Sequence, residues 1–342
     1  MGAAKASRAD KVAMAFAILV TILVISLFLV RGMAPWLANA LYRKGESSLR
    51  KSDYIGAMGC YDAAIFLKHD FTEAYASRGR ARMNFRLLLD RHRRPSRSID
   101  YDMAVEDFNT AIRLNPSCPE PYVDRGLAYW VEGHDDQAFQ SYDQAIHISP
   151  SDVDAFEARA SAHAERKEFD LAILDYTQCI RLAPDLAGPY ISRAYTYSQM
   201  DKSDLAIADE DRAIDISPND GGAWNDRCWD RAIIGKLADA REDCEHALDL
   251  YPHYAAALDS LGFVYLKMKK PAMAIANYNA ALAEAPKYPT SLYGRGLAEL
   301  QKGDPDAATT DIEAAKSIQP DIADEFAKWG VPVPSEALNE KQ

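Results

Sequence analysis

The sequence predicts an all-α protein in which one transmembrane helix precedes a long array of helical repeats. Two observations predict the array: proline recurs every 34 residues, and alanine recurs at the same spacing twelve residues before each proline. The third observation is an uncharged apolar run over residues 12–30. Because about 20 apolar residues span a bilayer as a helix, this run is long enough for a membrane anchor.

Composition and charge restrict the classes of function. The 342 residues are 48% hydrophobic and 26% charged, which is typical of a folded protein. The chain has 39 Lys and Arg against 51 Asp and Glu, a net charge of -12. Because nucleic-acid binding depends on basic surface, this balance argues against a nucleic-acid partner. The five cysteines have no metal-type spacing, so neither a disulfide scaffold nor a zinc module is indicated.

The N-terminal region has three interpretations. We expect residues 1–11 to be a short basic tail and residues 12–30 to be a transmembrane helix. One alternative is a cleaved signal peptide, since Ala-Asn-Ala at 38–40 resembles a cleavage site. The apolar run is, however, longer than the usual core of a signal peptide, and that cleavage would cut into the first repeat. The other alternative is a buried helix of a soluble domain.

The orientation of the anchor follows only weakly from charge. Basic residues are nearly balanced on the two sides of the apolar run, so the positive-inside rule hardly discriminates. A short basic tail followed by a large domain favours the tail inside and the domain outside. We therefore expect a single-pass protein of a bacterial inner membrane with the repeats on the periplasmic side.

The repeat is defined by two sets of residues with the same period. The prolines are Pro116, Pro150, Pro184, Pro218, Pro252, Pro286 and Pro320. The alanines are Ala104, Ala138, Ala172, Ala206, Ala240, Ala274 and Ala308. Upstream, Ala57 matches the alanine position, but it precedes Ala104 by 47 residues, which is one period plus an insertion of 13.

A 34-residue period with these positions resembles the tetratricopeptide repeat family. The resemblance implies a right-handed superhelical solenoid of about eight helix-turn-helix repeats. With proline at position 32 of each repeat, the repeats are 38–71, 72–118, 119–152, 153–186, 187–220, 221–254, 255–288 and 289–322. Position 8 is small in every repeat, and positions 4, 11 and 24 are often bulky, which lets paired helices approach and fill the space between them. We expect a capping helix at 323–330 and a flexible tail at 331–342.

One position departs from the family pattern. Position 7, usually Leu, is Arg78, Arg125, Arg159, Arg193, Arg227 and Arg295, whereas the repeat at 255–288 keeps Leu261. Position 23 is Asp107, Asp175, Asp209, Asp243 and Asp311. We expect an Arg–Asp bridge that recurs along the array and orients each helix pair. The alternative is that both side chains face solvent.

The resemblance implies a binding groove lined by the first helix of each repeat, mainly at positions 2, 5, 9 and 12. In the C-terminal repeats these positions are apolar and aromatic: Ile191, Tyr195, Asn225, Trp229, Phe263, Tyr293 and Leu297. Exposed aromatic residues are good anchors for a protein or peptide partner. The alternative is that position 9 packs sideways. No repeat has the Lys and Asn of the family's carboxylate clamp, so chaperone binding is not implied.

The 13-residue insertion, around residues 86–98, is basic. It contains Arg86, Arg91, Arg93, Arg94 and Arg97. Three interpretations remain open: a solvated loop, contact with anionic lipid headgroups, or contact with an acidic partner.

No catalytic, cofactor or metal motif is found in the sequence. It has no Walker A loop, no HExxH and no nucleophile elbow, and we expect no cofactor. Cys228 and Cys244 lie on the two helices of one repeat; they fill core positions or, outside the cytoplasm, form a disulfide. The expected function is a non-catalytic, membrane-anchored scaffold for protein partners. The alternatives are a receptor for a small molecule or glycan, an enzyme, and a secreted periplasmic repeat protein.

Overall fold

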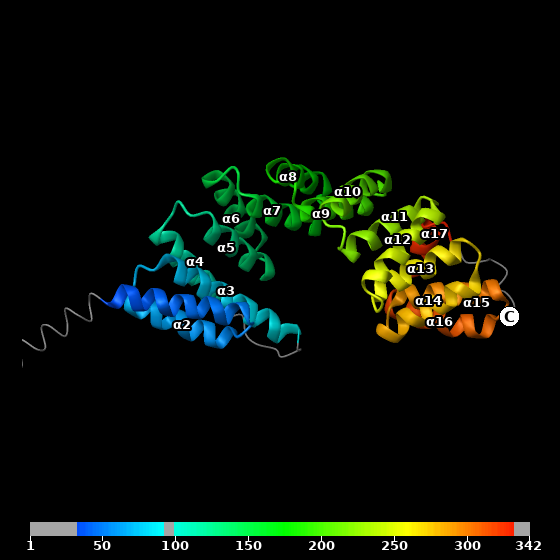
Figure 1. The fold of residues 1–342 in the computed structure, drawn as a ribbon, viewed down its shortest axis with the longest axis horizontal. Coiled ribbons are helices and arrows are strands. Elements are labelled where there is room, and N and C mark those ends of the chain that lie inside the picture. The colour runs from blue at the N-terminus through cyan, green and yellow to red at the C-terminus, as the bar shows by residue number, and fades with distance from the viewer. Residues whose placement is uncertain (1–32, 92–98, 332–342) are drawn as a thin grey trace, which may run out of the picture. The chain divides into compact units, whose positions relative to one another are not determined.

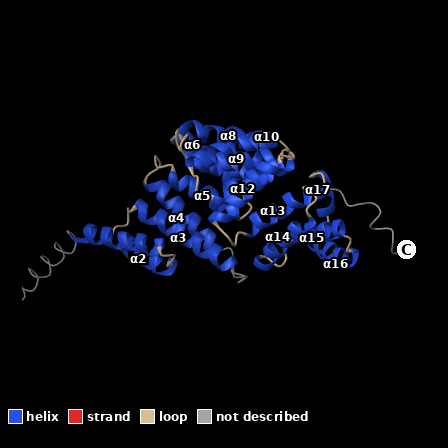
Figure 2. Ribbon diagram, turned by 45° about the vertical axis from the view of Figure 1, so that its right-hand side comes forward, coloured by secondary structure: helices blue, strands red, loops and turns tan. Residues whose placement is uncertain are grey.

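The computed structural model describes residues 33–91 and 99–331, and all regular structure in these ranges is helical (Figure 2). The prediction of an all-α helical array is confirmed for this part of the chain. The predicted transmembrane helix at 12–30 lies outside the described residues. Within them, no helix is both long enough and apolar enough to cross a bilayer.

The helices form two compact units, Met1–Ala158 and Arg159–Gln342, and the boundary falls inside α7, which is labelled in Figure 1. In the N-terminal unit, residues 33–50 are helical, and the next helices are α2 (Tyr54–Leu67), α3 (Thr72–Arg91), α4 (Ile99–Leu114), α5 (Glu120–Val131), α6 (Asp135–Ile148) and the start of α7 (Val153–Glu165). In the C-terminal unit, the rest of α7 is followed by α8 (Phe169–Leu182), α9 (Ala187–Gln199), α10 (Ser203–Ile216), α11 (Gly221–Ile233), α12 (Leu237–Leu250), α13 (Ala255–Lys267), α14 (Pro271–Glu284), α15 (Pro289–Lys302), α16 (Pro305–Ile318) and α17 (Ile322–Lys328).

The turn between the two helices of a repeat has the same backbone conformation in repeat after repeat. Position 15 has a positive φ, which ends the first helix in the left-handed region. The residues are Ser52, Gly133, Lys167, Asp201, Gly235, Lys269 and Gly303. Glycine adopts this conformation without strain and the other residues do not, so the turn geometry is kept even where the local sequence opposes it.

The paired helices approach closely because position 8 is small and position 24 is large. A Cβ added to Gly79 would lie 2.6 Å from the Phe108 ring, and one added to Gly262 would lie 2.8 Å from the Tyr278 ring. Both rings are fully buried. The small residue therefore provides the space that the aromatic ring of the second helix fills.

The predicted Arg–Asp bridges are confirmed at all five pairs. Each guanidinium donates two parallel hydrogen bonds of 2.5–3.0 Å to the aspartate at position 23 of its own repeat. The remaining arginine, Arg125, donates instead to the Ser141 hydroxyl at 3.2 Å. The alternative, in which both side chains face solvent, is wrong, since the carboxylates of Asp107 and Asp243 are almost completely buried.

Two of these arginines also join neighbouring repeats, a contact that the spacing within one repeat does not predict. Nη1 of Arg227 donates to Asp211 of the preceding repeat at 2.6 Å, and Nη1 of Arg193 donates to Thr177 at 2.9 Å. Each partner lies 16 residues before its arginine. One arginine therefore ties the first helix of its repeat to two second helices, its own and the previous one.

The C-terminal helix α17 packs across the first helices of the preceding repeats. The Phe326 ring lies 4.8 Å from the Tyr293 ring of α15 and 5.8 Å from the Phe263 ring of α13. The Trp329 ring, just after α17, lies 4.9 Å from the Trp229 ring of α11. α17 falls at the position expected for a capping helix, but it covers aromatic side chains of α13 and α15, and Trp329 after it reaches the edge of α11.

Candidate functional site

The predicted groove residues divide into a covered and an open group. Phe263, Tyr293 and Leu297 are at most 2% exposed, and the first two pack directly against α17. These three residues belong to the core, so the prediction that they anchor a partner is not supported by their burial. The reason is that α17 already occupies the face on which they lie.

The open group lies on α9 and α11. The Tyr195 side chain is 63% exposed, whereas Ile191 and Trp229 are partly buried and Asn225 is buried. The Trp229 ring stacks on the Phe263 ring at 4.8 Å, which fixes its orientation at the edge of the covered region. Tyr195 and Trp229 therefore remain as the aromatic side chains of the predicted groove that a partner can reach.

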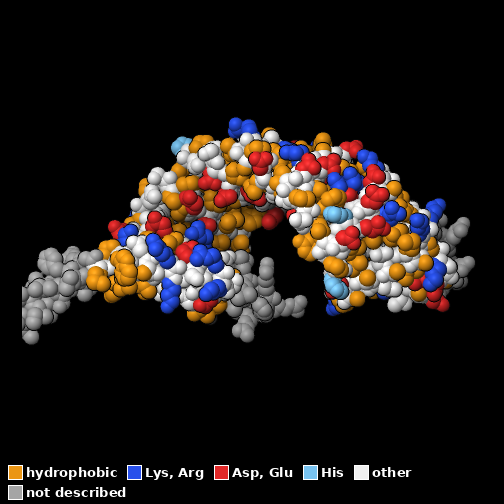
Figure 3. Space-filling model, viewed as in Figure 1, with side chains coloured by type: hydrophobic (Ala, Val, Ile, Leu, Met, Phe, Trp, Pro, Cys, Tyr) orange, Lys and Arg blue, Asp and Glu red, His pale blue; other side chains and the backbone are white. Residues whose placement is uncertain are grey.

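A pocket of about 230 Å³ lies between these aromatic side chains and α13. It is lined by Tyr195, Ser198, Gln199, Glu210, Asn225, Asp226, Trp229, Asp230, Ala256, Asp259, Ser260, Tyr288 and Thr290. These described lining residues include four carboxyl groups and no basic side chain. On the face of the C-terminal unit seen in Figure 3, by contrast, acidic and basic side chains are interspersed. The pocket is therefore an acidic site on a surface of mixed charge.

The four carboxyl groups are held by different partners. Ser198 donates to Asp230 at 2.5 Å, and Asn225 donates to Asp226 at 3.2 Å. Asp259 accepts from Thr290 at 2.8 Å and from Ser291 at 2.5 Å. Oε2 of Glu210 is buried and has no hydrogen-bond partner in the described part of the chain.

Burial raises the pKa of all four carboxyl groups. It raises the pKa of Glu210 to about 10, and the negative charges of Asp230 and Asp226 act in the same direction. Burial raises the pKa values of Asp226 and Asp259 to about 6. It also raises the pKa of Asp230, against the hydrogen bonds from Ser198, Ser203 and Glu210. At neutral pH Glu210 is therefore protonated, while the pocket keeps a net negative charge.

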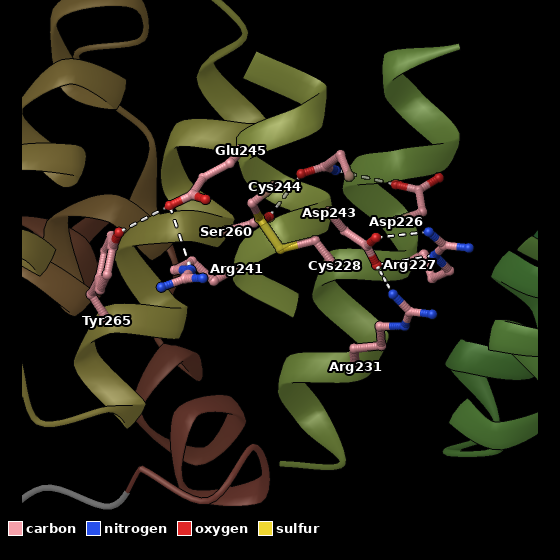
Figure 4. The surroundings of a disulfide bond; sticks show 11 residues. Asp226, Arg227, Cys228, Arg231, Arg241, Asp243, Cys244, Glu245, Ser260 and Tyr265 are labelled. Atoms are coloured by element: carbon pink, nitrogen blue, oxygen red, sulfur yellow. Dashed lines mark hydrogen bonds and ion pairs between the residues drawn. A yellow bond between two sulfur atoms is a disulfide. The ribbon is translucent and has the colours of Figure 1, made fainter. Parts of the chain in front are cut away.

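Two neighbouring repeats at this site depart from the packing of a large apolar residue at position 24 against a small residue at position 8. Position 24 is an aromatic or aliphatic residue in the other repeats, but it is Glu210 in one repeat and Cys244 in the next. Cys244 forms a disulfide with Cys228, across a Cα–Cα distance of 5.4 Å (Figure 4). The disulfide alternative for these cysteines is thereby confirmed. In the repeat with Glu210, no bulky ring fills the space between the helices, and the pocket opens beside it.

The disulfide lies within the Arg–Asp network of the same repeat. Figure 4 shows Arg227 and Arg231 converging on the carboxylate of Asp243, whose neighbour in the chain is Cys244. The Arg231 bond to Asp243 measures 2.6 Å. Helices α11 and α12 are therefore joined by a covalent bond and by two arginines, and this rigid pair holds Asp226, Trp229 and Asp230 in place.

Part of the basic insertion belongs to helix α3. Helix α3 continues to Arg91, so the first part of the insertion is helical backbone and not a loop. This is consistent with its run of leucine and arginine, which favour helix. The side chains of Arg86 and Arg91, and the whole of Arg93, Arg94 and Arg97, lie outside the described residues.

The residue types that line the pocket do not indicate a catalytic mechanism. No histidine or lysine lies among the residues that line the pocket. Within the described ranges, no group of three or more His, Cys, Asp or Glu side chains is arranged to hold a metal ion. Paired carboxyl groups with displaced pKa values do occur at functional sites of all kinds, so they mark a candidate site without fixing its chemistry.

Two family profiles, each described as Tetratricopeptide repeat, match the sequence. One matches residues 97–153 and 261–321, and the other matches residues 187–220. In these ranges the chain contains tetratricopeptide repeats. No curated protein matches the sequence.

Several solved structures are similar to this chain in fold. The APC/C hetero-tetramer Cut9–Hcn1 aligns at a TM-score of 0.59 and 18% identity, over 87% of this chain and 55% of that one. A tetratricopeptide repeat protein of Parabacteroides merdae aligns at 0.54 and 20% identity, over 68% and 93%. PilW, a type IV pilus biogenesis factor, aligns at 0.53 and 17% identity, over 59% and 94%. At these identities the likeness extends to the fold alone.

Sequence reasoning missed the acidic pocket, although a signal for it was present. Glu210 stands at position 24, where a bulky apolar side chain is expected between two helices. A carboxyl group at a core position is costly to bury, so such a residue marks a site that departs from simple packing. Asp226 and Asp230 lie one helical turn apart on α11, but their convergence with Glu210 and Asp259 depends on how three repeats stack.

Proposed function

We propose that this chain is a non-catalytic scaffold that binds a segment of a partner protein on the α9–α11 face of its C-terminal unit. The observation that carries the proposal is the pocket beside Tyr195 and Trp229, which stays open, whereas α17 covers Phe263 of α13 and Tyr293 of α15. An exposed aromatic side chain at the rim of a partly buried pocket is the arrangement of a binding hot spot.

The size of the pocket favours a side chain as the occupant. Sites for drug-sized ligands occupy roughly 300–1,000 Å³, whereas this pocket measures about 230 Å³. A receptor for a glycan or a larger small molecule is therefore the less favoured function. The Cut9–Hcn1 structure, which is similar in fold, is a hetero-tetramer, and this agrees with a scaffold role.

We further propose that the scaffold is anchored in a bacterial inner membrane by residues 12–30, with its repeats on the periplasmic side. The Cys228–Cys244 disulfide supports a location outside the cytoplasm, because disulfides persist in oxidising compartments and are rare in the cytosol. The lipid bilayer is then a second binding partner, through residues 12–30.

Site-specific photocrosslinking in cells tests the scaffold role. A photoreactive amino acid replaces Tyr195, and in a matched control it replaces Leu205, an exposed residue on α10 of the same repeat. We expect a discrete crosslinked protein from position 195 and none from position 205. Equal crosslinking from both positions, or none from either, contradicts a specific partner site on this face.

A further inference from the structure

The pocket carries negative charge, and none of its described lining residues is basic. Asp226, Asp230 and Asp259 reach it from α11 and α13, and Glu210 reaches it from α10. Arg227, which lies on α11 beside Asp226, is directed to Asp211 and Asp243. Lys328 lines a neighbouring pocket together with Asp230, and it pairs with Asp201 at 2.8 Å. Among the described residues, no ion pair therefore joins a basic side chain to any of the four pocket carboxyl groups.

The Glu210 side chain is an independent sign that the pocket is a site. It is only 2% exposed, it lines the pocket, and its Oε2 has no hydrogen-bond partner among the described residues. A buried oxygen without a partner costs free energy, which a ligand that donates a hydrogen bond recovers. In the preceding repeat, Tyr176 occupies the same position, packs with Ala160 and fills the space between the helices without burying a carboxyl group.

We propose that the pocket formed by Glu210, Asp226, Asp230 and Asp259 receives a basic side chain, lysine or arginine, from the bound partner segment. The proposal rests on the scaffold function above and names the chemistry that its site recognises. The carboxyl groups supply acceptors for an ammonium or guanidinium group. Trp229 and Tyr195 lie at the same pocket and supply aromatic surface, to which cations are also attracted.

Charge and shape together select this occupant over others. An acidic or neutral side chain would leave the carboxylates unpaired and further desolvated, which opposes binding. A basic side chain neutralises them, and its aliphatic stem suits the apolar part of the wall formed by Trp229, Ala256 and Tyr288. The partner segment is therefore expected to present one Lys or Arg at a fixed place in its sequence.

A displayed library of random twelve-residue peptides, selected on the full chain, tests the inference. The selected peptide is synthesised with its basic residue and, as a matched neutral form, with citrulline for arginine or norleucine for lysine. Affinities are measured by fluorescence anisotropy for the native chain, Tyr195→Ala, Asp226→Asn and the control Asp215→Asn. Asp215 carries the same charge as Asp226 but lies exposed on α10, 3.3 Å from Arg212.

We expect every selected peptide to contain a basic residue whose neutral replacement weakens binding at least about tenfold. Asp226→Asn should weaken binding by a similar factor, and Asp215→Asn by less than about threefold. Thermal unfolding and circular dichroism establish that each variant is folded. The asparagine variants preserve the shape of the side chain, so a folding failure is not expected.

The other outcomes separate the inference from the function on which it rests. Peptides that bind, lose affinity in Tyr195→Ala, but need no basic residue overturn the inference and leave the scaffold site intact. Free argininamide that binds as tightly as the peptide also overturns it, since the site would then serve a small organic cation. Peptides insensitive to Tyr195→Ala, or the absence of any selected peptide, contradict the scaffold site itself.

Discussion

Arg227 holds the carboxylate of Asp243 by two parallel hydrogen bonds of 3.0 and 2.7 Å, and both side chains are buried. The same geometry recurs in four other repeats, where it replaces the apolar packing expected at position 7. A buried ion pair is not in itself a strong source of stability, because desolvation offsets much of the attraction. Its value here is geometric: the planar guanidinium fixes the angle between helices and reaches the preceding repeat as well.

A double-mutant cycle on Arg193 and Asp209 tests this role. Arg193→Leu or Asp209→Asn alone leaves a buried charge without its partner, and each is expected to cost about 3 kcal/mol of unfolding free energy. The double variant recreates the Leu261 and Asn277 of another repeat, so it should recover much of that loss. Urea unfolding followed by circular dichroism gives the coupling energy. Additive losses in the double variant contradict the bridge.

Burial of Glu210 predicts a specific dependence of stability on pH. Its pKa in the folded chain is raised to about 10, above the ordinary glutamate value of 4.5. The folded state therefore binds the proton more tightly, and this stabilising contribution, complete below pH 4.5, is lost as pH rises through about 10. The groups that face Glu210 are Asp226, Asp230 and Arg227.

The variant Glu210→Gln removes this titration while keeping the side-chain shape. We expect the variant and the native chain to unfold at similar temperatures near pH 5, and the variant to become progressively more stable by comparison between pH 6 and 9. The measurement is the melting temperature of both proteins at a series of pH values. A difference that does not change with pH contradicts the buried, protonated state of Glu210.

The disulfide predicts a redox-dependent stability of the C-terminal unit. Closing a loop of 16 residues stabilises a fold by about 3 kcal/mol in the chain-entropy account. Reduction of Cys228–Cys244 should lower the urea midpoint of the native chain accordingly. The double variant Cys228→Ala/Cys244→Ala should have the urea midpoint of the reduced protein, and adding reductant should not change that midpoint. Identical midpoints for the native chain with and without reductant would argue against the bond.

Helix α17 is expected to be an integral part of the C-terminal core. The Phe326 side chain is 1% exposed and touches the rings of Phe263 and Tyr293, so Phe326→Ala should cost about 3–5 kcal/mol. The matched control is Phe66→Ala, which removes the same side chain from a site where it is 75% exposed, at a cost under about 0.5 kcal/mol. Chemical denaturation compares the two. Equal effects of the two substitutions would mean that α17 does not hold its place on α13 and α15.

Much of the fold can be predicted from the sequence because the same residue types recur at the same positions of each repeat and make the same local contacts. Prolines at position 32 follow the second helices, and small residues at position 8 leave space for rings such as Phe108. The paired charges at positions 7 and 23 predict Arg–Asp bridges. These relations hold within one repeat, between residues of known helical register. They can therefore be recognised from spacing alone.

The candidate site could be predicted from the sequence only in part, because it depends on contacts between helices that are far apart in the chain. Position 9 identified Tyr195 and Trp229 as groove residues, and both line the pocket. The same reasoning also predicted Phe263 and Tyr293 as groove residues, but both are buried under α17. Spacing within a repeat cannot show that α17 turns back and covers them. The acidic pocket was missed because its carboxyl groups come from three consecutive repeats, and only Glu210 breaks a local packing rule.

The most direct test of a partner site at this pocket is the affinity of the selected peptide for the variant Glu210→Tyr. The substitution restores the aromatic residue of other repeats, and the pairing of Ala160 with Tyr176 indicates that a ring fits beside Ala194. Removing a buried carboxyl group should also raise the unfolding free energy by about 1–3 kcal/mol. We predict a well-folded protein, at least as stable as the native chain, that binds the peptide at least about tenfold more weakly. A folded Glu210→Tyr variant that retains native affinity would contradict the assignment of this pocket as the binding site.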